Sequence, residues 1–175
     1  MELFYGAILL GFLTINILNT PPFNKLCKKI NTPEKIEIWA KHCLKYESDQ
    51  KLFGVSNYWQ SWEEMYKSKT GDCEDFAGII SEILSRNGYE NFIMVFGNDK
   101  RAHAVCIFKY NDSDEWSFFS NYLLCETNTQ KIKNIPYYYN DGDLRPTWGY
   151  TCKTNEDDII ETFDYEEEKW EKYQV

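Results

Sequence analysis

The stretch that decides the fold reads KTGDCEDFAGIISEIL and covers residues 69–84. Gly71 and Asp72 close a loop, and apolar residues then recur at helical spacing at positions 76, 77, 80, 83 and 84. This periodicity predicts a helix that begins at Cys73 and stops at Asn87-Gly88. One cysteine therefore lies in the first turn of a long amphipathic helix.

The first turn of a helix is a favourable place for a thiolate. Its unpaired backbone N–H groups and the helix dipole stabilise an anion, so they lower the pKa of a cysteine there. Asp72 at the N-cap and Asp75 three residues later are expected to accept backbone N–H groups and support the helix start. Their charges oppose a thiolate at Cys73, so the site needs a positive group, and an imidazolium within hydrogen-bond reach would serve.

Helix signals precede this stretch and strand signals follow it. Thr32 and Pro33 start an amphipathic helix predicted over 33–47, and the capping box Ser61-x-x-Glu64 predicts a short helix over 62–68. Apolar segments separated by turns then predict antiparallel strands over residues 92–97, 103–110 and 116–124. Helices followed by a strand meander indicate an α+β fold.

The last forty residues carry weaker signals. Residues 137–139 and 147–152 are expected to form one more strand or an ordered loop. Residues 156–172 are predicted to be helical, with Ile159 and Phe163 among the residues that face inward.

The chain has two histidines, and one of them follows a tight turn. His42 lies on the polar side of the first predicted helix and is expected at the surface. His103 opens a strand between Ala102 and Ala104, whose small side chains permit another element to come close. It can point one ring nitrogen at a thiol and the other at an acceptor. We predict Asn121, at the end of the next strand, as that acceptor, because adjacent strands lie about 4.8 Å apart.

Each of these residues has an ordinary structural explanation when it is taken alone. A cysteine at a helix start is more often structural, and an asparagine at a strand end usually caps a backbone group. The combination favours chemistry, because a thiol, a histidine and a polar acceptor occur in the order and at the element ends that a cysteine triad requires.

Five segments carry a resemblance to a known family. They are YWQS at 58–61, Glu64, GDCEDFA at 71–77, HAV at 103–105 and WSFFSN at 116–121. Together they resemble the transglutaminase-like superfamily, in particular the bacterial transglutaminase-like cysteine peptidases. The similarity extends over about residues 33–124. It implies a papain-like core, in which a helix bearing the cysteine packs on an antiparallel sheet.

The resemblance assigns roles to individual residues. It implies Cys73 as nucleophile and His103 as base, and Asn121 falls where the family usually has aspartate. Trp59 and Gln60 are then candidates for the oxyanion hole or the cleft, although a core role for Trp59 is an equal alternative.

A metal is a further implication of the resemblance. In some bacterial relatives the acids that flank the cysteine bind calcium, and Asp72 and Glu74 match those positions. Helix capping and surface charge also explain these two acids, and we prefer that explanation. The predicted chemistry requires no cofactor.

The expected function is acyl transfer through a thioester, and the resemblance favours a peptidase that acts on a protein or peptide substrate. A transamidating enzyme or an arylamine-type acetyltransferase is one alternative. A catalytically silent binding or scaffold module with the same fold is another.

Charge argues against a nucleic-acid partner. The formal net charge is −9. Residues 156–175 hold nine acids and two lysines, which gives −7 for that segment and leaves the rest of the chain close to neutral. A chain with this balance and no basic cluster repels phosphate backbones. The six cysteines include no CxxC pair, and we expect reduced thiols.

The N-terminal segment 3–18 reads LFYGAILLGFLTINIL and carries no charge. As a helix it would extend about 24 Å, against a hydrocarbon core of about 30 Å. Three lysines follow it at positions 25, 28 and 29, so an uncleaved anchor would leave the domain in the cytoplasm. An atypical signal peptide of an exported protein and a buried helix are the alternatives. We therefore expect a hydrophobic segment (1–20), a globular domain (30–155) and an acidic helix or tail (156–175).

Overall fold

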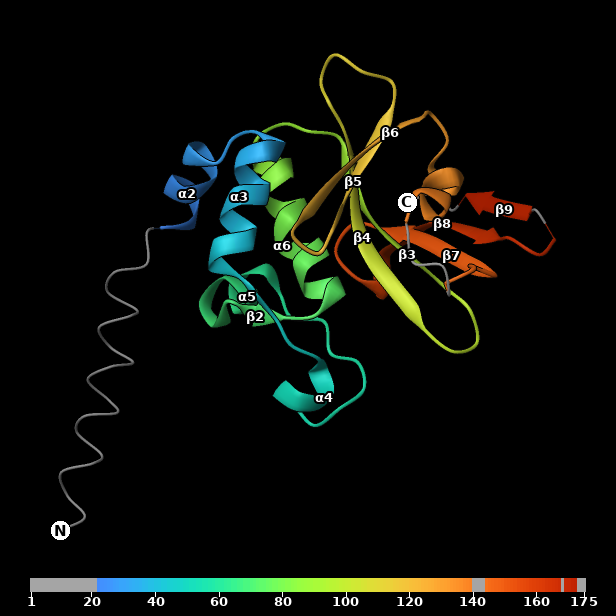
Figure 1. Cartoon of the computed structure of the whole chain (residues 1–175), viewed down its shortest axis with the longest axis horizontal. Helices are drawn as coiled ribbons and strands as arrows, with labels where there is room; N and C mark the ends of the chain where they lie inside the picture. The colour runs from blue at the N-terminus through green and yellow to red at the C-terminus, as the bar shows by residue number, and fades with distance from the viewer. Residues whose placement is uncertain (1–21, 140–143, 168, 173–175) are drawn as a thin grey trace, which may run out of the picture.

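The computed structural model describes residues 22–139, 144–167 and 169–172. Its α-helices lie on one face of a seven-stranded sheet, as Figure 1 shows. The strand order is β6-β5-β4-β3-β7-β8-β9, and every neighbouring pair is antiparallel. This arrangement confirms the predicted α+β fold with the cysteine-bearing helix packed on an antiparallel sheet.

The helical half contains five α-helices in the described residues. They are α2 (Phe23–Lys29), α3 (Pro33–Cys43), α4 (Asp49–Leu52), α5 (Trp62–Ser68) and α6 (Cys73–Arg86). The helices predicted over 62–68 and from residue 73 are confirmed, and so is the capping box between Ser61 and Glu64.

Two details of this half differ from the sequence expectation. Helix α3 ends at Cys43 rather than near residue 47, because Lys45–Tyr46 (β1) pairs in parallel with Thr70–Gly71 (β2). Helix α2, which begins directly after Pro22, is not among the helices expected from the sequence. It is held by burial of Phe23, whose ring stacks on Trp62 at a centroid distance of 4.3 Å.

The sheet is built from two strand groups joined by a 3-10 helix. The strands are β3 (Asn91–Gly97), β4 (Ala102–Lys109), β5 (Trp116–Ser120), β6 (Leu123–Thr129), β7 (Trp148–Cys152), β8 (Ile159–Asp164) and β9 (Lys169–Lys172). The 3-10 helix η1 (Ile132–Tyr138) follows β6 and covers residues 137–138, so only the second of the two uncertain late segments is a strand.

The single strand predicted over 116–124 is wrong, because the chain turns back after Ser120. Ser120 pairs with Leu123 across a two-residue turn. Asn121, the first residue of that turn, has φ +52°, a left-handed conformation that asparagine tolerates better than most residues. Apolar residues continue on both sides of the turn, so hydrophobicity alone does not indicate that the strand ends there.

The helix predicted over 156–172 is also wrong. The segment forms a short 3-10 turn, η2 (Glu156–Asp158), and then strands β8 and β9. Isoleucine, threonine and phenylalanine in IIETF favour a strand, and β8 completes the hydrogen bonding of the β7 edge. The acidic segment is therefore part of the sheet, and a domain limit at residue 155 leaves out two strands.

Two apolar clusters cover the two faces of the sheet. The first lies under the helices, and from β4 it receives Ala104, Cys106 and Phe108. The second lies on the opposite face, and from β4 it receives Val105 and Ile107. This alternation follows from the period of two in a strand.

Within the described residues no helix is both long and apolar enough to cross a membrane. Residues 3–18, the predicted anchor or signal, lie outside those residues, so that assignment stays a prediction. All six cysteines carry free thiols, and Cys27, Cys106 and Cys152 are buried.

Candidate active site

Helix α6 starts at Cys73, and the loop before it is tightly packed. Asp72 is the N-cap, and its backbone N–H donates to Oδ2 of Asp75 at 3.2 Å. A Cβ atom at Gly71 would lie 2.6 Å from Cβ of Asp75, so no side chain fits at this position without displacing that carboxylate. The glycine and the two aspartates of the GDCED segment thus set where the thiol sits, as the capping pattern predicted.

Gln60 secures the same loop from the other side. Its backbone N–H donates to Oδ1 of Asp75 at 2.8 Å, and its side-chain Nε2 donates to Oδ2 at 2.6 Å and to the Thr70 carbonyl at 2.9 Å. Both amide hydrogens of Gln60 are therefore used, which leaves no side-chain donor for an oxyanion. Trp59 is half-buried and packs against the first cluster, in agreement with its core alternative.

The Cys73 thiol is half-buried and borders both a carboxylate and the sheet. Its Sγ donates to Oε2 of Glu74 at 3.1 Å, and it receives a hydrogen bond from the backbone of Ala104 in β4. Burial first, and then the Glu74 charge, raise the pKa of this thiol well above its ordinary value. The lowered pKa expected from the helix start alone is not found, because desolvation and the adjacent acid outweigh the helix dipole.

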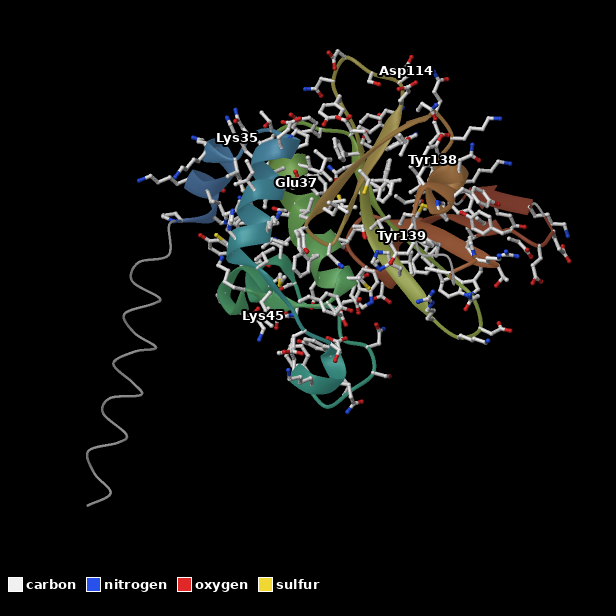
Figure 2. All side chains as sticks on the ribbon, in the orientation of Figure 1. Lys35, Glu37, Lys45, Asp114, Tyr138 and Tyr139 are labelled. Atoms are coloured by element: carbon white, nitrogen blue, oxygen red, sulfur yellow. The ribbon has the colours of Figure 1, made fainter. Side chains whose placement is uncertain are left out.

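His103 is buried between two aromatic rings on the second face of the sheet. Its ring stacks on Tyr139 at 4.4 Å and 21°, and meets Phe96 edge-on at 6.0 Å. Tyr139 lies beside β4 in Figure 2. The ring Nε2 lies 2.9 Å from Oγ of Ser120, the last residue of β5. Stacking and this hydrogen bond together fix the orientation of the imidazole.

The thiol and the imidazole are brought to the same end of β4. Ala104, which contacts the thiol, is the neighbour of His103 in the strand. Tyr46 links the two sides: burial, then the charges of Cys73, of the acids at 72 and 74 and of Tyr139, raise the pKa of Tyr46 to about 12. Tyr139 in turn stacks on His103. The Tyr46 phenol is thus within electrostatic range of the nucleophile, of the acids and of the ring that stacks on the histidine.

Asn121 is not the residue that the histidine contacts through Nε2. Its Oδ1 is buried and has no hydrogen-bond partner among the residues that the structure describes. Its role as the orienting residue stays a prediction. Ser120 was missed because no motif marks it, although its alternation with Phe118 places it on the same face as His103. His42 is exposed on α3, as predicted.

Three acids form a cluster beneath the thiol. One oxygen each of Asp49, Asp72 and Asp75 lies within 4.8 Å of the others, and Asp49 is only 1% exposed. The Asp49 N–H donates to Oδ2 of Asp72 at 3.4 Å, and the Tyr58 N–H donates to Oδ2 of Asp49. The second oxygen of Asp49 and that of Asp72 are buried and lack a hydrogen-bond partner in the described part of the chain.

The protonation of these acids reflects their crowding. Burial, followed by Glu74, raises the pKa of Asp72 to about 7, and burial raises the pKa of Asp75 to about 6. Burial also raises the pKa of Asp49. Asp72, Cys73 and Glu74 form a second close group. Unpaired, buried carboxylate oxygens suit a hard cation, so these clusters could hold a metal ion. Sequence patterns did not point to Asp49, which lies in a different helix.

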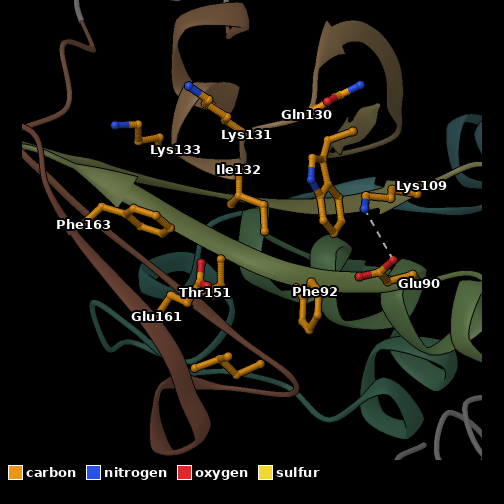
Figure 3. A pocket seen from close by; sticks show the side chains of 12 residues that line it. Glu90, Phe92, Lys109, Gln130, Lys131, Ile132, Lys133, Thr151, Glu161 and Phe163 are labelled. Carbon is orange, nitrogen blue, oxygen red and sulfur yellow. Dashed lines mark ion pairs between the residues drawn. The ribbon is translucent and has the colours of Figure 1, made fainter. Parts of the chain in front are cut away.

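A separate hollow lies on the second face, far along β4 from His103. It has a volume of about 580 Å³, and its lining includes Phe92, Trp116 and Ile132. Figure 3 shows the ion pair between Lys109 and Glu90 at its edge, with an N–O distance of 3.7 Å. Neither Cys73 nor His103 lines it, so this hollow is not the candidate active site.

Comparison with known proteins identifies the family of this chain. A family model described as a transglutaminase-like domain matches residues 17–115, more than half of the 175 residues. No curated protein sequence matches the chain.

Similar solved structures include three of LapG from Legionella pneumophila. The calcium-bound form is 23% identical, with 75% of this chain and 67% of that chain covered and a TM-score of 0.47. A second LapG structure is 24% identical, with coverages of 70% and 64% and a TM-score of 0.46. The EGTA-treated form is 21% identical, with coverages of 79% and 73% and a TM-score of 0.46. The chain thus spans about two thirds of the length of these LapG chains.

Proposed function

Since this chain belongs to the transglutaminase-like domain family, we propose that it is a cysteine-dependent acyl-transfer enzyme that hydrolyses amide bonds in a protein or peptide substrate. One observation carries the proposal. The Cys73 thiol, at the start of α6, interacts with the backbone of Ala104, the residue that follows His103 in β4, and Ser120 orients the His103 ring. A thiol at a helix start and an imidazole held by a further polar group are the parts that nucleophilic catalysis needs.

The reaction begins with transfer of the Cys73 proton to Nδ1 of His103 as the sulfur attacks the carbonyl carbon. The S–H bond breaks, the N–H and S–C bonds form, and the carbonyl oxygen becomes an oxyanion near the backbone N–H of Cys73. The oxyanion then collapses, and the C–N bond breaks as the imidazolium gives its proton to the leaving amine. This leaves a thioester on Cys73.

The second half of the reaction releases the acyl group. His103 accepts a proton from water as the water oxygen attacks the thioester, and the imidazolium then returns the proton to the departing sulfur. The products are a carboxylic acid and the original thiol. Without a bound cation, burial and Glu74 raise the pKa of the thiol, so in that state the proton leaves during attack rather than beforehand.

We further propose calcium as the cation of the acid cluster. Asp49, Asp72 and Asp75 would hold it, with Glu74 at the adjoining group, because all their donors are oxygens and two buried oxygens lack partners. When bound, the ion would neutralise the negative charge that raises the pKa of the thiol. Calcium should therefore raise the melting temperature of the wild-type chain, and Asp49→Asn should remove most of that effect.

Alkylation of the cysteines tests the enzyme proposal. The chain, supplied with millimolar calcium, is treated with iodoacetamide at about pH 6, below the ordinary pKa of a free thiol, and each cysteine is quantified by mass spectrometry. We expect Cys73 to react faster than the exposed Cys43, and His103→Ala to remove the difference. His42→Ala serves as the matched control. Reaction at Cys73 no faster than at Cys43 would refute the proposal and favour a binding module.

A further inference from the structure

We propose that Ser120 is the positioning residue that holds the His103 imidazole for proton transfer, in the place where Asn121 is expected from the sequence. This inference rests on the proposed roles of Cys73 and His103. Its direct observation is the distance of 2.9 Å between Nε2 of His103 and Oγ of Ser120.

The strand register explains why these two side chains meet. Ser120 is paired with Val105 in the neighbouring strand, and His103 lies two residues before Val105 on the same face. Diagonal neighbours of this kind lie roughly 7–8 Å apart, which a histidine side chain spans. The contact is therefore a consequence of the β4–β5 pairing and not of a mobile loop.

The position of Ser120 is fixed on three sides. It pairs with Val105 in β4 and with Leu123 in β6, and it follows the buried Phe119. Tyr139 holds the opposite surface of the imidazole by stacking. The hydroxyl and the phenol ring thus restrain both the rotation and the tilt of His103.

A serine hydroxyl can donate or accept, and the proposed reaction uses the tautomer in which Nε2–H is the donor. With Nε2–H donating to the Ser120 oxygen, the neutral ring carries its lone pair on Nδ1, the nitrogen that takes the Cys73 proton. Serine does this without a charge, so it orients the imidazolium but stabilises it less than a carboxylate would.

Asn121 has a different explanation in this structure. Its left-handed φ of +52° is required by the two-residue turn between β5 and β6. Glycine adopts that conformation without cost, so Asn121→Gly removes the carboxamide and keeps the turn. This substitution makes the two neighbouring residues separable by experiment.

Amide hydrolysis by the full chain, measured as kcat and KM against pH on an unfolded protein substrate, compares Ser120→Ala, Ser120→Thr and Asn121→Gly. We expect Ser120→Ala to lower kcat about tenfold with little change in KM, as loss of a hydrogen bond to a charged ring predicts. Ser120→Thr keeps the hydroxyl and should recover most of the rate. Asn121→Gly should lose less than Ser120→Ala. Thermal unfolding shows whether each variant is folded.

A second readout does not depend on turnover. The ¹⁵N shifts of the His103 ring report its tautomer, and Ser120→Ala should reduce the share of the Nε2–H form, which Ser120→Thr restores. Full activity and an unchanged tautomer in folded Ser120→Ala, with loss in Asn121→Gly, would overturn this inference while the cysteine mechanism stands. Hydrolysis that survives Cys73→Ala would overturn both.

Discussion

The two faces of the sheet are made by the same strands and carry different halves of the candidate site. On the helical face, α6 closes the first cluster, and Cys73 lies at the edge of that cluster. On the opposite face, Phe96 and Tyr139 enclose His103 at the edge of the second cluster. The halves approach where β5 ends at Ser120 and the chain turns at Asn121.

The proposed arrangement of thiol and histidine depends on an interruption of the sheet. A strand that ran on past residue 120 would keep covering β4 beside Ala104, where the thiol now lies. The two faces also differ in charge. The thiol face holds the crowded acids, whereas Tyr139 and Phe96 pack against the histidine ring on the other face.

The largest effect is expected from removal of the thiol on the helical face. Cys73→Ala should lower amide hydrolysis by about 10⁴-fold or more, because the covalent route is lost. The rate of hydrolysis in the steady state measures it. Cys43→Ala, an exposed cysteine at the end of α3, is the matched control and should keep the wild-type rate.

A measurement of stability tests whether strand β8 packs its side chains into the second cluster. Phe163 in β8 is 6% exposed and belongs to the second cluster. Phe163→Ala should lower the free energy of unfolding by about 3 kcal/mol through lost burial and a cavity. Denaturant unfolding measures the change. An unchanged stability would contradict the finding that the acidic C-terminal segment is part of the sheet.

Removal of the base on the second face should have a smaller effect than removal of the thiol. His103→Ala is expected to lower kcat about 10²-fold, in the usual range for loss of a general base. The dependence of the rate on pH that comes from titration of the imidazole should also disappear. If His42→Ala lowered the rate as much, the assignment of the base to the second face would be wrong.

The smallest predicted effect concerns the acids of the helical face. Their folded-state pKa values lie above the ordinary value of 3.8, so the folded state binds more protons and stability falls as pH rises from about 4 to about 7. In chelator at about pH 8, Asp72→Asn should stabilise the chain by about 1 kcal/mol, or roughly 2–4 °C, allowing for screening at a half-buried site.

Asparagine is also a good N-cap residue, so Asp72→Asn removes the charge and keeps the capping of the helix. Thermal unfolding at both ends of the pH range checks the sign, because the gain should vanish near pH 4, where the aspartate is protonated. Asp112→Asn, in the exposed turn after β4, is the control and should change stability little at either pH. If Asp72→Asn lowered the stability at pH 8, the charge of Asp72 would not be destabilising in the folded state, and the prediction would be wrong.

Sequence alone located the parts whose signals are local. Three features depend on neighbours a few residues apart. They are the helical spacing of apolar residues along the 14 residues of α6, the Ser61–Glu64 capping box and the first two strands of the sheet. The same is true of GDC, where Gly71 is needed because Asp75 occupies the space of its side chain. Cys73 and His103 were found in this way, as residues at predicted element ends.

Tertiary structure decided which residues those ends meet. The strand register brings Ser120 to the imidazole, and Asp49 joins the other acids from a different helix. The side-chain amide of Gln60 donates to Asp75 and to the Thr70 carbonyl. The raised pKa of the thiol follows from burial and from Glu74, and the strands at the C-terminus follow from an unpaired edge at β7. The physical reason is common to all of them: propensity and periodicity act over a few residues, whereas desolvation, register and hydrogen-bond partners depend on segments that only folding brings together.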